Sequence, residues 1–206
     1  MEIKLFKMLT IVMITMAATS SLATAAALPK TGQIKCYNDA GTEITCTGTG
    51  QDGASQAGVA IPSPRFVNNN NGTITDTLTN LTWLRNANCW GAMTWLAALT
   101  KANALASSQC TLTDGSTAGT WRMPNRKELA SLVSYAVADN ATALINAGFL
   151  NVQTSTAYWS SSTESNNTAF AWAVNFASSA DTLAPAIVDA GKTTESLSIW
   201  PVKGGM

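Results

Sequence analysis

Residues 121–133 have the sequence Trp-Arg-Met-Pro-Asn-Arg-Lys-Glu-Leu-Ala-Ser-Leu-Val, and they carry the clearest local signal for the fold. Pro124 lacks the N–H that a helix interior needs, so a helix has to begin after it. Asn125 followed by Glu128 is the Asn-x-x-Glu pattern of a capping box, in which each side chain accepts a hydrogen bond from the other residue's backbone N–H. The apolar residues at helical spacing behind this cap are Leu129, Leu132 and Val133. The stretch therefore predicts a helix capped by Asn125.

The segments before this helix predict one more helix and three short strands. Between Thr94 and Ser107, apolar residues recur at helical spacing, which is typical of an amphipathic helix. Residues 65–67 and 73–76 are mostly apolar or β-branched and flank an Asn-rich turn that ends in Asn-Gly, a pattern typical of a β-hairpin. Residues 81–84 predict a further strand.

The segments after the helix predict strands only. Residues 157–162 are rich in aromatic residues and serine, and residues 170–176 alternate large and small side chains with a period of two. Residues 197–202 predict the last strand, with Pro201 favouring a sheet edge or strand end. The order of strands, two helices and then antiparallel strands indicates an α+β fold in a single domain, which we expect to span residues 65–206.

The first 27 residues have the parts of a bacterial secretory signal. Lys4 and Lys7 precede an apolar run from Met8 to Ala18, and small residues that suit signal peptidase follow before Leu28. The apolar run is shorter than the roughly 20 residues of a membrane-spanning helix, so we expect cleavage and no membrane span in the mature chain. The protein is then secreted, periplasmic or on the cell surface. Residues 28–64, which contain few large apolar side chains, predict a loop-rich N-terminal extension.

The composition argues against several functional classes. The chain has 12 Lys and Arg, 12 Asp and Glu, and no histidine, so it lacks the basic field that nucleic acid needs and cannot use a catalytic or metal-binding imidazole. Gly-x-Ser-x-Gly, Ser-x-x-Lys and the phosphate-binding Gly-x-x-x-x-Gly-Lys loop are absent. The Asn-rich turn would place Val67 and Leu78 at calcium-ligand positions, which excludes an EF-hand. We expect neither an enzyme nor a bound cofactor or metal.

Four cysteines in an exported chain predict two disulfides. Cys36 and Cys46 lie in the extension, while Cys89 and Cys110 bracket the helix expected between Thr94 and Ser107. The residues that flank this helix are numerous enough to bring its two ends back together. Of the three possible connectivities, we therefore prefer Cys36–Cys46 and Cys89–Cys110.

Tryptophans and basic residues supply the candidate ligand contacts. We expect Trp83, Trp95 and Trp200, which lie in periodic apolar runs, to belong to the core. Trp159 and Trp172 lie beside polar residues and could serve as flat stacking surfaces. Basic residues cluster at a helix start, where the helix dipole disfavours positive charge, so they are candidates for another role. We expect the loops between Tyr135 and Lys192 to hold the ligand. The candidate contacts are Arg122, Arg126, Lys127, Trp159, Trp172 and Lys192.

A series of short motifs resembles the C-terminal domain family of the Legionella collagen-like adhesin. The motifs, in order, are Pro64-Arg65-Phe66, Asn71-Gly72-Thr73-Ile74-Thr75-Asp76, Leu81-Thr82-Trp83-Leu84, Ala87-Asn88-Cys89, Leu112-Thr113-Asp114-Gly115-Ser116, Trp121-Arg122-Met123-Pro124-Asn125, Glu128-Leu129, Tyr158-Trp159-Ser160-Ser161, Ala171-Trp172-Ala173-Val174 and Trp200-Pro201-Val202-Lys203-Gly204-Gly205. The resemblance implies a C-type-lectin-like domain in an exported bacterial protein. It also implies adhesion, since the adhesin that names the family binds sulfated glycosaminoglycans through basic residues on a trimer.

This chain departs from that adhesin in two respects. It has no collagen repeat, and residues 28–206 carry 10 basic against 11 acidic side chains, which is unfavourable for a sulfated polymer. The sequence therefore predicts a non-enzymatic exported module that binds a glycan or a protein surface. The alternative is a structural envelope or matrix protein without a small ligand.

Overall fold

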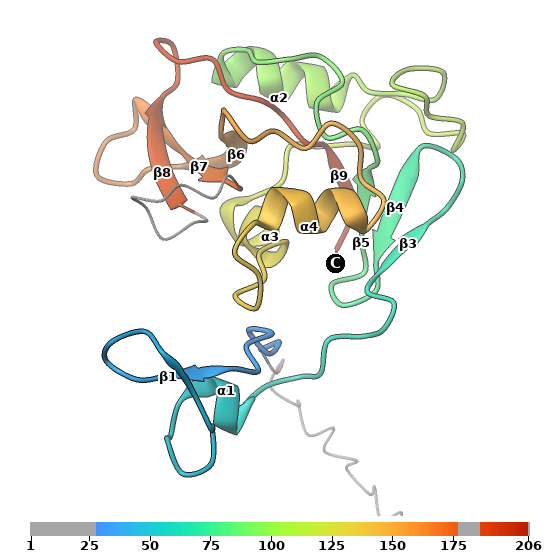
Figure 1. Cartoon of the computed structure of the whole chain (residues 1–206). Coiled ribbons are helices and arrows are strands. Elements are labelled where there is room, and N and C mark those ends of the chain that lie inside the picture. Colours follow the sequence, from blue (N-terminus) through green and yellow to red (C-terminus); the bar gives the residue numbers. More distant parts are fainter. Residues whose placement is uncertain (1–27, 177–185, 206) are drawn as a thin grey trace, which may run out of the picture.

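The structure, a computed structural model, describes residues 28–176 and 186–205, so the predicted signal sequence lies outside the described residues. Its helices and strands are mixed along the chain and the strand pairs are antiparallel, which confirms the predicted α+β class (Figure 1). The elements are β1 (Cys36–Tyr37), β2 (Glu43–Ile44), α1 (Asp52–Ser55), β3 (Phe66–Asn68), β4 (Thr73–Asp76), β5 (Leu81–Leu84), α2 (Trp95–Asn103), α3 (Arg126–Ser131), α4 (Asn140–Asn146), β6 (Tyr158–Thr163), β7 (Phe170–Asn175), β8 (Ala186–Gly191) and β9 (Val202–Gly204).

The predicted hairpin forms half of a four-stranded sheet with the order β3-β4-β5-β9. β3 and β4 pair antiparallel across the Asn-rich turn, as predicted. The turn ends at Gly72, whose φ is +84°, and a Cβ there would lie 2.6 Å from the carbonyl oxygen of Thr111. Only glycine combines this backbone conformation with so close an approach of another chain segment. The turn of the hairpin therefore packs directly against the backbone of the loop that follows α2.

A second sheet has the order β6-β7-β8 and is covered on both faces. β7 keeps the predicted period of two, but small as well as large residues are buried. Ala171 and Ala173 pack with α2 on one face, while Val174 packs with the cluster that contains α3 on the other. Trp172, which alternates with the two alanines, points to the α3 side and is half-buried.

Aromatic rings dominate the core between the two sheets. Trp200 lies at its centre with no exposed surface, and ring centroids surround it at 5.0–5.9 Å in four directions. The four rings belong to Trp83, Phe149, Tyr158 and Phe176. The indole N–H of Trp200 donates to the carbonyl oxygen of Leu84 at 2.8 Å, so the polar group of this buried ring has a hydrogen-bond partner.

The helices correct the sequence prediction in number and length. α2 ends at Asn103 rather than Ser107, because the chain turns at Ala104 to start the loop toward Cys110. A further helix, α4, was not predicted. It is only seven residues long, and its N-terminus is capped by the carboxylate of Asp139, which accepts the Thr142 N–H at 3.0 Å. The four-residue helix α1 was not predicted either, so residues 28–176 and 186–205 contain four helices where the sequence predicted two.

The C-terminal strand also differs from the prediction. β9 begins at Val202, whereas Leu197 and Ser198 make only isolated bridges to other segments. Pro201 just before β9 accepts a hydrogen bond from Leu84 N–H through its carbonyl at 3.0 Å. Pro201 has no N–H to donate, so regular pairing starts only after it.

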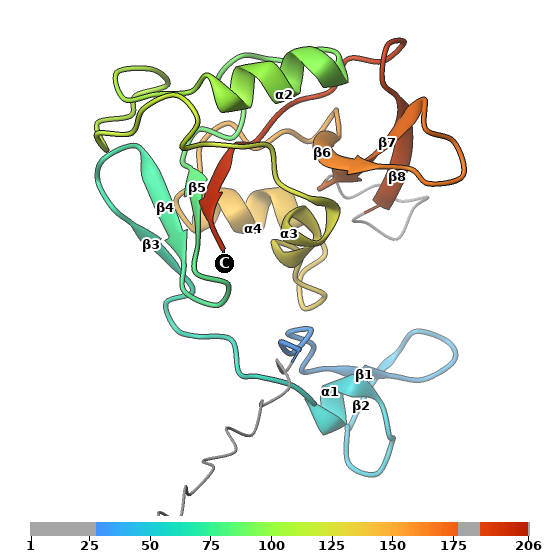
Figure 2. The same cartoon turned by 180° about the vertical axis from the view of Figure 1, so that it is seen from behind.

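Both predicted disulfides are present, with Cα–Cα distances of 5.1 Å for Cys36–Cys46 and 5.7 Å for Cys89–Cys110. The first closes the small hairpin of β1 and β2 in the N-terminal extension. Figures 1 and 2 show this extension lying to one side of the two sheets, at the end near α3 and α4. The Tyr135 N–H donates to the Thr31 carbonyl at 3.1 Å and joins the extension to the α3–α4 loop.

Candidate functional site

The start of α3 is fixed from two directions, so the basic side chains that follow project from a rigid backbone. The capping box predicted from the sequence is present: Glu128 N–H donates to Asn125 Oδ1 at 2.9 Å, and Asn125 N–H donates to Glu128 Oε2 at 2.7 Å. The carbonyl of Pro124 accepts the Ser161 N–H of β6 at 2.8 Å. α3 is thus anchored to the second sheet through Pro124, the residue before its N-cap.

We expect Asn125→Ala to lower the free energy of unfolding by about 1 kcal/mol, because the side-chain cap of α3 is lost. Chemical denaturation would measure the change. Asn125→Ser, which can still accept the Glu128 N–H, serves as the control and should retain most of the stability. An equal loss in both variants would show that the cap is not the source of the effect.

Arg126 and Trp172, both predicted as candidate contacts, are brought together on the α3 side of the second sheet. The guanidinium carbon of Arg126 lies 4.5 Å from the centroid of the Trp172 ring, a cation–π arrangement. The Arg126 backbone N–H donates to Ser162 Oγ at 3.1 Å, which fixes the residue over the strand. Within residues 28–176 and 186–205, no carboxylate forms an ion pair with Arg126. Its donors are therefore available to a ligand that reaches this half-buried pair.

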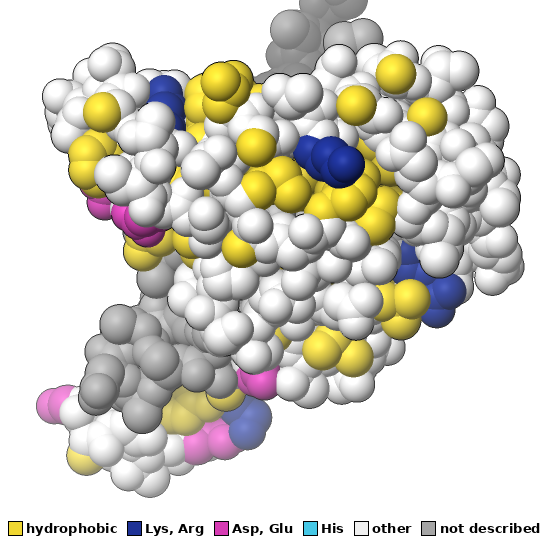
Figure 3. All heavy atoms as spheres, turned by 90° about the horizontal axis from the view of Figure 1, so that it is seen from above, with side chains coloured by type: hydrophobic (Ala, Val, Ile, Leu, Met, Phe, Trp, Pro, Cys, Tyr) yellow, Lys and Arg dark blue, Asp and Glu magenta, His cyan; other side chains and the backbone are white. Residues whose placement is uncertain are grey.

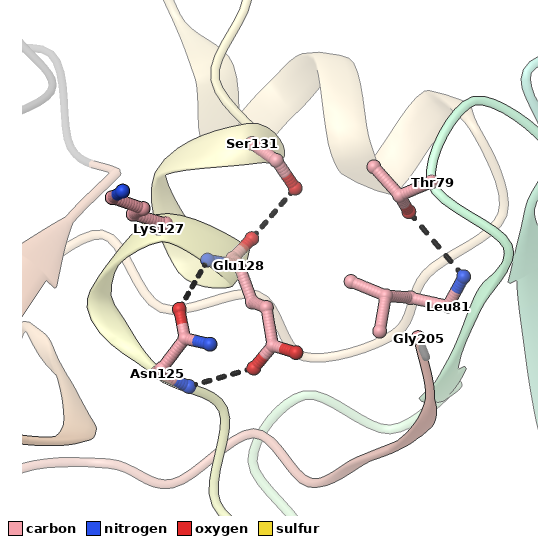
Figure 4. Close-up of a pocket in the computed structure, with 7 residues that line it drawn as sticks. All are labelled: Thr79, Leu81, Asn125, Lys127, Glu128, Ser131 and Gly205. Atoms are coloured by element: carbon pink, nitrogen blue, oxygen red, sulfur yellow. Dashed lines mark hydrogen bonds between the residues drawn. The ribbon is translucent and has the colours of Figure 1, made fainter. Parts of the chain in front are cut away.

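Lys127 and Asn125 belong to a neighbouring cleft of about 350 Å³. The cleft lies between α3, the turn before β5 and the residue after β9, and it is lined by Thr79, Leu81, Asn125, Lys127, Glu128, Ser131 and Gly205. Figure 4 shows Asn125 and Glu128 on one wall and Leu81 and Gly205 on the other, while the amine of Lys127 points away from the centre. Its lining joins an apolar side chain to several hydrogen-bonding groups, as small-ligand sites do.

Arg122 makes its hydrogen bonds within the chain. Its guanidinium donates to both carboxylate oxygens of Glu128 at 2.7 Å and to the carbonyl of Gly204 at 3.0 Å. The hydrogen bond with Glu128 raises the pKa of Arg122 above its ordinary value. Arg122 therefore ties the start of α3 to β9 and positions Glu128, while its side chain remains 42% exposed.

Lys192 lies apart from Arg126 and Trp172. Its ammonium is 4.2 Å from the Trp95 ring centroid and donates to Thr163 Oγ1 at 2.8 Å and to the Thr168 carbonyl at 3.0 Å. Trp95 packs against the cluster under α2, which is the opposite face of the second sheet from Trp172. The two cation–aromatic pairs thus do not form one surface.

The prediction that Trp159 contacts a ligand is wrong. Its side chain has no exposed surface, packs against Ala98 and Ala102 of α2, and donates its indole N–H to the Met93 carbonyl at 2.8 Å. The serines after it suggested an exposed position, but Ser160 is itself buried and donates to the carbonyl of Trp172 at 2.6 Å. Serine neighbours are poor evidence of exposure when their hydroxyls bond to the backbone.

Sequence reasoning did not single out the cleft residues outside α3. Thr79 and Gly205 are far apart in the sequence and meet only because β5 pairs with β9. Lys101 was also not named as a candidate from the sequence, although its ammonium lies 5.6 Å from the Trp90 ring centroid. Figure 3 looks onto the face that carries α2, where apolar side chains gather around a basic group. Neither feature has a local sequence signal, since both depend on long-range packing.

Residues 28–176 and 186–205 contain no group of three or more Cys, Asp or Glu side chains placed to hold a metal ion. In the same part of the chain, no helix is long and apolar enough to cross a membrane.

Comparison with protein families agrees with the motifs. A family model described as the Lcl C-terminal domain matches residues 72–203, a range that begins just before β4 and includes most of β9. Comparisons with curated proteins and with solved structures gave no match. The matched range covers more than half of the 206 residues and contains Arg126, Lys127 and Trp172. The chain therefore belongs to the Lcl C-terminal domain family.

Proposed function

We propose that this protein is an exported, non-enzymatic binding module with a C-type-lectin-like fold, and that it recognises a glycan through the surface around the start of α3. The observation that carries the proposal is the stacked pair of Arg126 and Trp172, which joins an aromatic ring to a cation without an acidic partner among the described residues. The nearby cleft with Asn125 and Ser131 adds polar groups of the kind that bind sugar hydroxyls.

Export is supported by the N-terminal sequence pattern and by the two disulfides. Disulfides persist in oxidising compartments such as the bacterial periplasm and the cell exterior. A rigid scaffold also suits recognition, because a site whose backbone is anchored loses little conformational entropy when a ligand binds. The capping box and the Ser161 hydrogen bond give the start of α3 this rigidity.

The surface has a specific physical requirement for its ligand. The Arg126 guanidinium lies over the ring, so a sugar would meet the guanidinium donors first and the ring beside them. A planar cation with several donors binds vicinal hydroxyls or a carboxylate in a defined orientation. Stacking on the indole would hold the Arg126 side chain in place for that contact.

A glycan-array screen of the oxidised chain from Leu28 to Met206 tests the proposal. We expect saturable binding that Arg126→Gln weakens about 10-fold or more, because the loss of a charged hydrogen bond costs roughly 1.5–3 kcal/mol. Lys101→Gln is the matched control, since it removes a cation from a tryptophan ring on the α2 face and should leave binding unchanged. Titration of the array hits by calorimetry would give both affinities.

Two outcomes would contradict the proposal. Equal losses in Arg126→Gln and Lys101→Gln would mean that net charge, and not the α3 surface, controls binding. Silence of the wild-type chain on the array would remove the glycan function and leave recognition of a protein or a structural role in the envelope.

A further inference from the structure

We propose that Asn166, in the loop between β6 and β7, is an acceptor site for an N-linked oligosaccharide. The inference rests on the proposed export, because oligosaccharide transfer from a lipid carrier to asparagine takes place on the outer side of the membrane. An Asn-x-Thr sequence is the minimal acceptor. It occurs four times, at Asn71, Asn80, Asn140 and Asn166.

Three of these four sites are poor acceptors. Asn140 is 2% exposed within α4, and its Oδ1 accepts the Ser134 N–H at 2.7 Å. The amide of Asn71 is engaged by Thr73, whose Oγ1 donates to Asn71 Oδ1 at 2.7 Å and which is itself buried. Asn80 is exposed, but the threonine of its Asn-x-Thr sequence, Thr82, belongs to β5, which pairs with β4 on one side and β9 on the other. An enzyme needs the asparagine and the threonine together in a loop that it can draw into its own site.

Asn166 meets this requirement. Residues 165–169 are all exposed and connect two strands of the second sheet, so a glycan attached here would extend into solvent. The threonine of this acceptor, Thr168, lies in the same exposed loop. No core residue has to move to reach either side chain.

A second feature singles out Asn166 from the other three. It is preceded two positions earlier by Glu164, which completes the sequence Glu-Ser-Asn-Asn-Thr. Bacterial oligosaccharyltransferases use this extended acceptor, with an acidic residue at that position. The corresponding residues before the other acceptors are Asn69, Leu78 and Ala138, none of which is acidic.

The folded loop indicates which part of the acceptor sequence has to move to be recognised. Glu164 is only 8% exposed, and its Oε1 accepts the Asn166 N–H at 3.0 Å. The Glu164 N–H donates to the Phe170 carbonyl at 3.0 Å and closes the base of the loop. The acid therefore faces inward once the sheet has formed, so an enzyme that reads Glu164 has to open the base of the loop, whereas Asn166 and Thr168 are exposed already.

The chemistry of the transfer balances without a redox partner. The side-chain nitrogen of Asn166 attacks the anomeric carbon of an oligosaccharide carried on a polyprenyl pyrophosphate. The bond from that carbon to the pyrophosphate oxygen breaks, the lipid pyrophosphate leaves with the electron pair, and the amide nitrogen gives up one proton. The product is an N-glycosidic bond and the free lipid pyrophosphate.

Export of the full chain in a bacterial host that carries an oligosaccharyltransferase and its lipid-linked oligosaccharide tests the site. Intact mass spectrometry should show loss of the signal sequence, two disulfides and a mass gain of one glycan. The gain should vanish in Asn166→Gln and in Thr168→Val, and should fall at least 10-fold in Glu164→Gln. Thr168→Ser, which keeps the hydroxyl, and Asn80→Gln, which removes another acceptor, should both retain it.

The mass distinguishes the failure of this inference from failure of the proposed export. A chain that keeps its signal sequence contradicts the export on which the inference depends. A processed, oxidised chain without a glycan overturns the assignment of Asn166 alone, as does a glycan that persists in Asn166→Gln. Glycan-array binding by the chain is measured separately and is independent of either result.

Discussion

Replacement of Trp200 by alanine is expected to lower the free energy of unfolding by about 3–5 kcal/mol, the range for truncating a large buried aromatic residue. Trp200 has no exposed surface and contacts the rings of Phe149 and Tyr158 at centroid distances of 5.0 and 5.3 Å. The substitution leaves a cavity at the centre of the core and an unpaired carbonyl at Leu84, which accepts the indole N–H in the wild type. Denaturant unfolding followed by circular dichroism would measure the loss.

A second variant keeps this prediction testable if Trp200→Ala does not fold. Trp200→Phe retains an aromatic ring and should give a folded protein with a smaller loss. Leu96→Ala is the control, because Leu96 is 69% exposed on α2 and should change the stability by less than about 0.5 kcal/mol. If Trp200→Ala cost no more than this control, the core would not be organised around Trp200.

Replacement of Asp76 by alanine is expected to have a comparable effect, about 3–5 kcal/mol, because it removes one member of a buried ion pair. Arg65 donates to both carboxylate oxygens of Asp76, at 3.0 and 2.7 Å, and the exposed fractions of the two side chains are 10% and 0%. Without Asp76, the Arg65 charge stays near the core with the Ser131 carbonyl and the Phe66 ring as partners but no carboxylate to neutralise it. Thermal and denaturant unfolding would both report the loss.

The exposed pair of Lys35 and Glu43 provides the control for Asp76. Both side chains are 55% exposed, and solvent screens their attraction. Glu43→Ala should therefore leave the unfolding midpoint unchanged within error. The double variant Arg65→Met with Asp76→Leu should recover much of the loss, since the unpaired charge is then absent. Failure to recover would show that Asp76 acts through its other contact, the Leu78 N–H, at 3.0 Å.

The parts of the fold that were predicted correctly depend on local chemistry. The capping box of α3 and the β3–β4 hairpin arise from residues a few positions apart, so their patterns are visible in the sequence. The disulfides followed from cysteine number and spacing. By contrast, α4 has seven residues and only a short apolar stripe, and the start of β9 depends on pairing with β5, more than 100 residues earlier. Both are decided by tertiary contacts.

The candidate site shows the same division. Arg126 and Trp172 were singled out separately from local context, and their stacking depends on how α3 packs against β7. Trp159 was misplaced because its polar neighbours bond to backbone carbonyls within the structure. Whether a tryptophan beside serines is exposed depends on which sheet face the strand register assigns to it. The register between β6 and β7 shifts between Trp159 and Thr163, so a simple alternation does not predict the face.

The pairing of β9 with β5 has a consequence for the order of events during synthesis. The chain emerges from its N-terminus, so Trp200 and β9 are made after every other element of the structure described here. Until they appear, the first sheet lacks an edge strand and the aromatic rings around Trp200 have no common partner. A nascent chain therefore cannot complete this core until its last residues have been synthesised.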